Sequence, residues 1–107
     1  MDFETFDGLM KVYDKLIDAG NELISSGFAI ESRHVTNVNK QAEKIIELLN
    51  KNLGLEKDSA GYTTIDWYIE NKISDDSDLH RITAGGREYM IYSNADLYNF
   101  ITKVELK

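Results

Sequence analysis

The sequence contains no cysteine and no proline among its 107 residues. Without cysteine, disulfide bonds and thiolate-bound metal ions are excluded, which fits a reducing compartment. Apolar runs are also short, Tyr89–Tyr92 being one of the longest, whereas a membrane-spanning helix needs about 20 apolar residues. The N-terminal residues Met1–Glu4 include two acids, where a secretory leader would be basic. We therefore expect a cytoplasmic protein with no membrane partner and no cleaved leader.

Basic residues are scarce as well: 12 lysines and arginines face 19 acids, a net charge of −7. The excess lies in residues 1–26 (six acids, two lysines) and 56–78 (seven acids, two lysines), while segments 27–55 and 79–107 each carry four basic residues and three acids. This argues against direct binding to nucleic acid or anionic lipid, which needs clustered Lys and Arg. Two interpretations stay open: a solvated surface that promotes solubility, or a docking surface for a basic partner.

The length and the 42% hydrophobic content are typical of one globular domain, so we expect a single domain over residues 1–107. Apolar residues recur every three or four positions over 3–26 and again from a start between 29 and 36 up to Leu53, which predicts two amphipathic helices. Gly27 and Gly54 are typical residues for ending them. The short connection favours an αα-hairpin. Gly8 and Gly20, inside the first helix, indicate either a close backbone approach or a frayed end.

Residues 56–63 are predicted to be a loop, and two alternatives exist for the segment after it. Its β-branched and aromatic residues suit a strand, but Thr63 with Asp66 three residues later is similar to a capping box, and we favour a short helix. An exposed turn over 74–78 follows. Gly85-Gly86 between segments 79–84 and 87–92 predicts a β-hairpin in which Ile82 faces Tyr89.

A final helix is predicted to follow the hairpin, with Ser93 as its N-cap and Asp96 at its third position. Its apolar face continues through Val104. The fold class is therefore α+β, mainly helical: an N-terminal αα-hairpin, a short third helix, a β-hairpin and a C-terminal helix.

Motifs of catalysis are missing, and we expect neither an enzyme nor a bound cofactor or metal ion. The sequence has no P-loop, no dinucleotide-binding glycine pattern and no HExxH motif. An EF-hand loop counted from Asp76 would place Arg81 where glycine is needed and Arg87 where a bidentate glutamate is needed. His80 falls on a face of the predicted hairpin, where a hydrogen-bonded structural role is the better interpretation.

The remaining signal is a set of acids beside aromatic residues. Carboxylates one helical turn apart, such as Asp14 and Asp18, lie about 5–6 Å from each other, a spacing comparable to that of phosphates along one nucleic-acid strand. Trp67 and tyrosines are common anchors of protein interfaces. The residues predicted to bind a partner are Asp14, Asp18, Glu22, Asp66, Trp67, Glu70, Asp75, Asp76 and Asp78.

In general character the chain resembles small proteins encoded by phages and mobile elements, being short, acidic and free of Cys and Pro. Inhibitors of bacterial defence that mimic nucleic acid, such as anti-CRISPR and anti-restriction proteins, are similar in this way. The resemblance implies a protein-binding module that docks on a basic surface, for example that of a nuclease. The alternative is a homo-oligomeric scaffold, for example a homodimer. The heptad spacing of the first two helices also suits pairing between chains.

Overall fold

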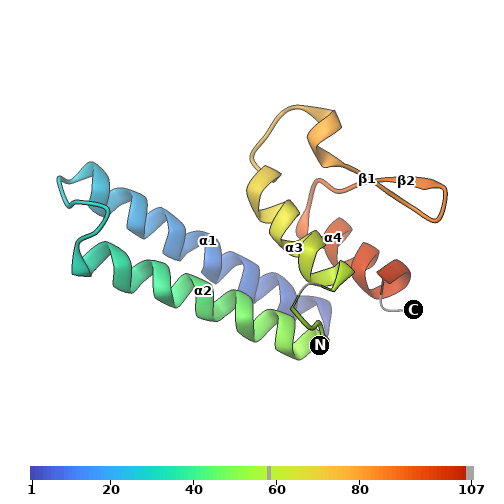
Figure 1. Ribbon diagram of the computed structural model, residues 1–107, viewed down its shortest axis with the longest axis horizontal. Coiled ribbons are helices and arrows are strands. Elements are labelled where there is room, and N and C mark those ends of the chain that lie inside the picture. Colours follow the sequence, from blue (N-terminus) through green and yellow to red (C-terminus); the bar gives the residue numbers. More distant parts are fainter. Residues whose placement is uncertain (58, 106–107) are drawn as a thin grey trace. The chain divides into compact units, whose positions relative to one another are not determined.

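A computed structural model describes residues 1–57 and 59–105 of the chain. Its elements follow the order α1, α2, α3, a 3₁₀ helix (η1), β1, β2, α4 and a π-helical segment (η2), shown in Figure 1. The mainly helical α+β architecture predicted from the sequence is confirmed. The chain divides into two compact units, Met1–Gly54 and Leu55–Lys107, so the prediction of a single domain stays a prediction. Each unit is described by itself below.

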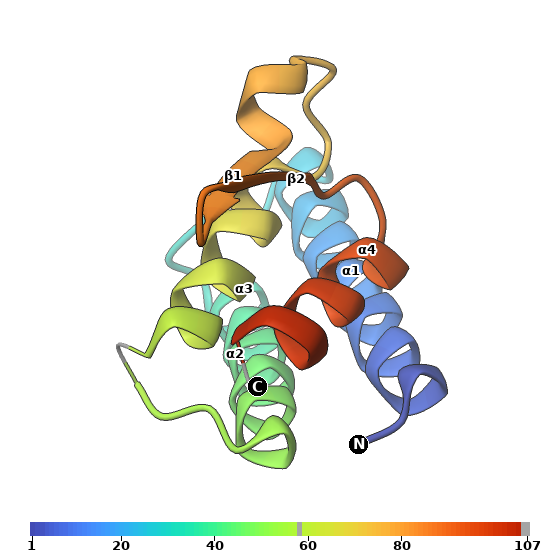
Figure 2. The ribbon, with the colours of Figure 1, turned by 90° about the vertical axis from the view of Figure 1, so that its right-hand side faces the viewer.

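The first unit is the predicted αα-hairpin of α1 (Phe3–Ser25) and α2 (Arg33–Leu53), which run side by side in opposite directions (Figures 1 and 2). Asp2 caps α1 and Ser32 caps α2, each accepting a hydrogen bond from the backbone N–H three residues on. Buried apolar side chains come from both helices. They are Phe6, Met10, Val35, Ala42, Leu49 and Leu53.

Gly27 and Gly20 act in this unit as the sequence indicated, whereas Gly8, inside α1, marks neither a close approach nor a frayed end. Gly27 has a φ of 106°, and the N–H of Phe28 donates to the carbonyl of Leu23 at 3.0 Å, which is the Schellman ending of α1. A Cβ on Gly20 would lie 3.3 Å from Oδ1 of Asn39, so this glycine marks a close approach to α2. A Cβ on Gly8 would meet nothing within 4 Å.

In the second unit, α3 spans Ala60–Asn71. The helix predicted in place of a strand is confirmed, but its predicted start at Thr63 is wrong, as is the loop predicted over residues 60–63. The reason is that Ser59, not Thr63, is the N-cap: its Oγ accepts from the N–H of Tyr62 at 3.3 Å.

The β-hairpin pairs β1 (Arg81–Ala84) with β2 (Arg87–Met90), and Ile82 faces Tyr89 as predicted. Gly85 and Gly86 have φ values of 59° and 79°, the positive angles that a type I′ turn needs at both central positions. Both strands are shorter than predicted: η1 (Ser77–His80) takes up the residues before β1, and β2 ends at Met90, two residues before its predicted end. Part of the predicted turn over 74–78 is therefore 3₁₀-helical.

The chain closes this unit with α4 (Asn94–Phe100) and η2 (Ile101–Glu105). Ser93 is the N-cap as predicted, its Oγ accepting from the N–H of Asp96 at 3.1 Å. The predicted continuation of the helix through Val104 takes a π-helical form. The core of the unit is formed by Leu55, Ile65, Tyr68, Ile91, Leu97, Phe100 and Ile101.

Candidate functional site

The acidic residues predicted to bind a partner lie in three groups. The first is on α1, where Asp14, Asp18 and Glu22 follow one another at four-residue steps along one side of the helix. Asp18 and Glu22 are exposed, and Asp14 is half-buried. A rise of about 1.5 Å per residue separates successive members of this row by about 6 Å along the helix axis.

The second group lies on α3, where Asp66 and Glu70 are exposed and one turn apart, with half-buried Trp67 between them in sequence. Partial burial raises the pKa of Asp66, and the nearby negative charge of Glu70 raises it further. The group is therefore a like-charged pair, which a cationic partner would stabilise.

The third group is the turn before η1, where Asp75, Asp76 and Asp78 are all exposed. Hydrogen bonds within the turn fix its backbone: the N–H of Asp76 donates to Oγ of Ser74 at 3.1 Å, and the N–H of Asp78 donates to Oδ1 of Asp76 at 3.0 Å. Asp78 also pairs with Arg81 at 3.5 Å. The turn thus presents its carboxylates from an ordered backbone, close to the hairpin.

The α1 group belongs to the first unit, whereas the α3 and turn groups both belong to the second. The structure therefore places the α3 pair and the turn acids in one compact unit. Tertiary packing also decides which of the C-terminal aromatic residues are available to a partner: Tyr68 and Phe100 are buried, and Tyr92 is 50% exposed.

His80 has the hydrogen-bonded structural role that the sequence indicated, but it ends η1 and does not lie on a strand face as predicted. It is 1% exposed, with its ring nitrogens within hydrogen-bond distance of the carbonyl oxygens of Ser74 and Ile91. Its ring also lies against that of Tyr92, with 4.6 Å between their centroids. Within residues 1–57 and 59–105, no three His, Asp or Glu side chains come together as metal ligands could, and no helix is long and apolar enough to cross a membrane.

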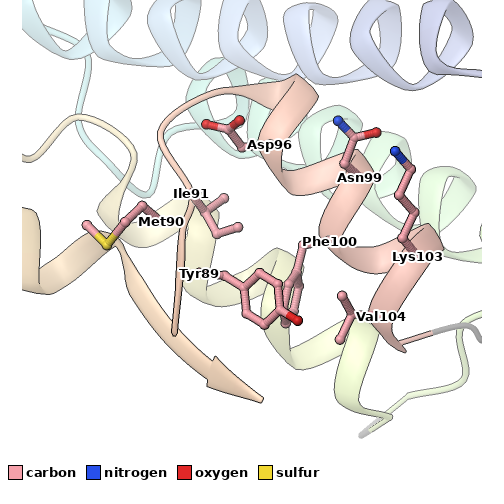
Figure 3. A pocket seen from close by; sticks show the side chains of 8 residues that line it. All are labelled: Tyr89, Met90, Ile91, Asp96, Asn99, Phe100, Lys103 and Val104. Carbon is pink, nitrogen blue, oxygen red and sulfur yellow. The ribbon is translucent and has the colours of Figure 1, made fainter. Parts of the chain in front are cut away.

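Sequence reasoning missed a groove in the second unit, shown in Figure 3. It has a volume of about 250 Å³, below the roughly 300–1,000 Å³ of pockets that hold drug-sized ligands. Tyr89 and Phe100 meet edge to face in it, with 5.0 Å between their centroids, and Lys103 and Asp96 bring charges to it. The residues that line it are Tyr89, Met90, Ile91, Asp96, Asn99, Phe100, Lys103 and Val104.

The sequence signals related to this groove are the apolar spacings of the last helix and of the hairpin. Neither spacing predicts that a groove remains between these two elements. Its size and mostly apolar lining suit one apolar side chain of a partner better than a polar substrate. Comparison of the chain with protein-family models, curated proteins and solved structures finds no match.

Proposed function

We propose that this protein is a non-enzymatic binding module that docks on a basic protein surface through its acidic groups. The observation that carries the proposal is the turn before η1, where Asp75, Asp76 and Asp78 are exposed within four residues. Removing such carboxylates from water costs free energy unless cations meet them. A surface bearing Lys and Arg is the partner that this arrangement fits best.

The more specific form of the proposal is an inhibitor of a nucleic-acid-targeting defence protein, encoded by a phage or mobile element, of the anti-CRISPR or anti-restriction type. Two features support it. The net charge of −7 opposes that of a nucleic-acid-binding groove. The row Asp14, Asp18 and Glu22 spaces its carboxyl groups by one helical turn, a distance comparable to that between phosphates. Such an inhibitor would act in the cytoplasm, where its target works.

An affinity capture from bacterial lysate tests this function. The immobilised protein is washed at low and at high salt, the captured proteins are identified, and each is purified and assayed for nucleic-acid binding with the acidic protein added. We expect to capture a basic nucleic-acid enzyme that elutes at high salt. Its binding to nucleic acid should decrease in proportion to the amount of the acidic protein added. Captured enzymes that keep full nucleic-acid binding would contradict the mimicry.

A variant with Asp75, Asp76 and Asp78 changed to Lys completes the test. If it captures and inhibits as well as the original protein, the turn is not the site. A matched control changes three other exposed acids to Lys: Glu31, in the connection between α1 and α2, and Glu43 and Glu47 on α2. That control gives the same charge change away from the predicted groups.

A second candidate function, the homo-oligomeric scaffold, is favoured by a different observation. The helical hairpin carries large apolar side chains at its surface, most clearly Ile30 at 66% and Leu48 at 44% exposed. Light scattering and sedimentation of the unmodified protein over a range of concentrations measure its mass. A stable dimer that Ile30→Ser with Leu48→Ser dissociates would support the scaffold, and a monomer at all concentrations would exclude it.

A further inference from the structure

The base of the β-hairpin carries exposed apolar side chains directly beside the acidic turn. Side chains alternate along a strand, and the register pairs Arg81 with Met90. Met90 therefore lies on the face of the strands opposite to that of Tyr89. The N–H of Ile91 donates to the carbonyl of His80 at 2.9 Å, so Leu79, in η1, and Tyr92, which follows β2, lie at the same end of the hairpin as Met90. Figure 3 shows Met90 pointing away from the side of Tyr89 and Ile91.

This surface is open to solvent. Leu79 is 44% exposed, Met90 38% and Tyr92 50%, whereas Ile91 is 1% exposed. Ile73, directly before the acidic turn, is 90% exposed. Large apolar side chains gathered in this way are typical of interaction sites rather than of ordinary surface.

Charge at the border of the surface is negative. Arg81 lies between the apolar residues and is paired with Asp78 at 3.5 Å and with Glu88 at 3.9 Å. Asp75, Asp76, Asp78 and Glu88 set four carboxylates against this one guanidinium, which leaves three negative charges. A partner of complementary chemistry carries cations around an apolar centre.

The position of the turn beside the surface is fixed by His80. Its Nε2 lies 2.6 Å from the carbonyl oxygen of Ser74, and its Nδ1 lies 3.0 Å from that of Ile91. Tyr92, on the exposed surface, lies against the same ring. The acids and the apolar side chains thus form one preorganised surface, which reduces the entropy lost on binding.

We infer that the surface of Leu79, Met90 and Tyr92 at the base of the hairpin, bordered by Asp75, Asp76 and Asp78, is the docking surface for a basic protein segment that presents an apolar side chain between Lys or Arg residues. This inference rests on the proposed function and narrows it to one of the three acidic groups. It also states that apolar contact, and not charge alone, selects the partner.

Two synthetic peptides serve as probes: one of lysine and leucine in helical amphipathic order, and one in which serine replaces every leucine. Fluorescence anisotropy at low salt measures the affinity of each, and amide shifts in ¹⁵N spectra locate the site. We expect the leucine peptide to bind about tenfold or more tightly than the serine peptide, because burying one large apolar side chain accounts for at least that factor. The shifted amides should lie within residues 73–81 and 88–92.

Two double variants test the two parts of the surface. Leu79→Ser with Met90→Ser should remove the preference for the leucine peptide, and Asp75→Lys with Asp76→Lys should weaken both peptides. The matched control, Glu43→Lys with Glu47→Lys at exposed positions on α2, should leave the preference unchanged, and Asp18→Lys with Glu22→Lys tests the α1 group separately. The ¹⁵N spectra of the same samples show that each variant is folded.

Three outcomes would overturn the inference. Equal affinity for both peptides would mean that charge alone attracts them. Loss of binding in the α1 variant, with the hairpin variants unaffected, would move the site to α1 and leave the proposed function intact. If neither peptide binds at low salt, the proposed docking on basic surfaces fails together with this inference.

Discussion

The Nε2 atom of His80 lies 2.6 Å from the carbonyl oxygen of Ser74, which ties the acidic turn to the base of the hairpin. The same ring reaches the carbonyl oxygen of Ile91 through Nδ1 at 3.0 Å, and it is 1% exposed. A buried polar group left without a partner costs roughly 1–3 kcal/mol. The imidazole therefore has a structural task that joins residues far apart in sequence, and removing it should be costly.

His80→Ala should lower the free energy of unfolding by about 2–4 kcal/mol, since it leaves a cavity and a carbonyl without its donor. Urea unfolding monitored by Trp67 fluorescence measures the change. His34→Ala is the matched control: His34 is exposed, and such surface changes alter stability by about 0.5 kcal/mol or less. Similar losses in the two variants would show that the His80 contacts contribute nothing particular.

Glu105 gives stability a pH dependence of defined sign. Burial raises the pKa of its carboxyl above the ordinary 4.5, although the hydrogen bond with Thr64 works in the opposite direction. The folded chain therefore holds this proton more tightly than the unfolded chain does. The contribution of this group to stability is present below pH 4.5 and is lost as the pH rises through the raised pKa.

Glu105→Gln should therefore raise the free energy of unfolding at pH 7 and flatten its fall as the pH rises above 4.5. The neutral amide keeps a hydrogen-bonding group beside Thr64 and removes the negative charge that burial destabilises. Urea unfolding from pH 4 to 8 measures the profile. Glu22→Gln, at an exposed position on α1, is the control. A Glu105→Gln profile parallel to that of the unmodified protein would contradict the assignment.

The Asp66–Glu70 pair predicts a shift that NMR titration of side-chain carboxyl carbons can measure. Glu70→Gln removes the negative charge that raises the pKa of Asp66, so that pKa should fall. It should stay above its ordinary 3.8, because burial is the larger cause. Glu88→Gln on the hairpin should leave the Asp66 titration unchanged. A return of the pKa fully to 3.8 would mean that burial has no part in it.

The start of α3 distinguishes the structure from the sequence-based expectation. Ser59→Ala removes the side-chain acceptor of the Tyr62 N–H and should lower the free energy of unfolding by about 1 kcal/mol. Thr63→Ala, at the position that the sequence suggested as the cap, lies inside α3 and is exposed, so it should be neutral or slightly stabilising. Urea unfolding of both variants measures the two changes in stability. A larger loss for Thr63→Ala than for Ser59→Ala would show that Thr63 is the N-cap.

These cases show where local sequence signals suffice. Ser93 with Asp96 gives α4 its N-terminus, and Gly27 followed by Phe28 gives α1 its end, because each device is completed within a few residues of the chain. Gly85-Gly86 likewise sets the hairpin register, since positive φ values at both positions fit a two-residue turn. The cap of α3 was missed because Ser59 and Thr63 are both acceptable caps, and local pattern alone does not rank them.

The sequence by itself determined the fold class, the helical hairpin, the β-hairpin register and the exposed acids of the turn, because periodicity, caps and charge are local properties. Only the tertiary structure decided which apolar side chains are covered. Leu79, Met90 and Tyr92 remain exposed while Ile91 is buried, and His80 holds the acidic turn beside them. Burial depends on what packs against a side chain from elsewhere in the chain, and the candidate docking surface arises from that packing.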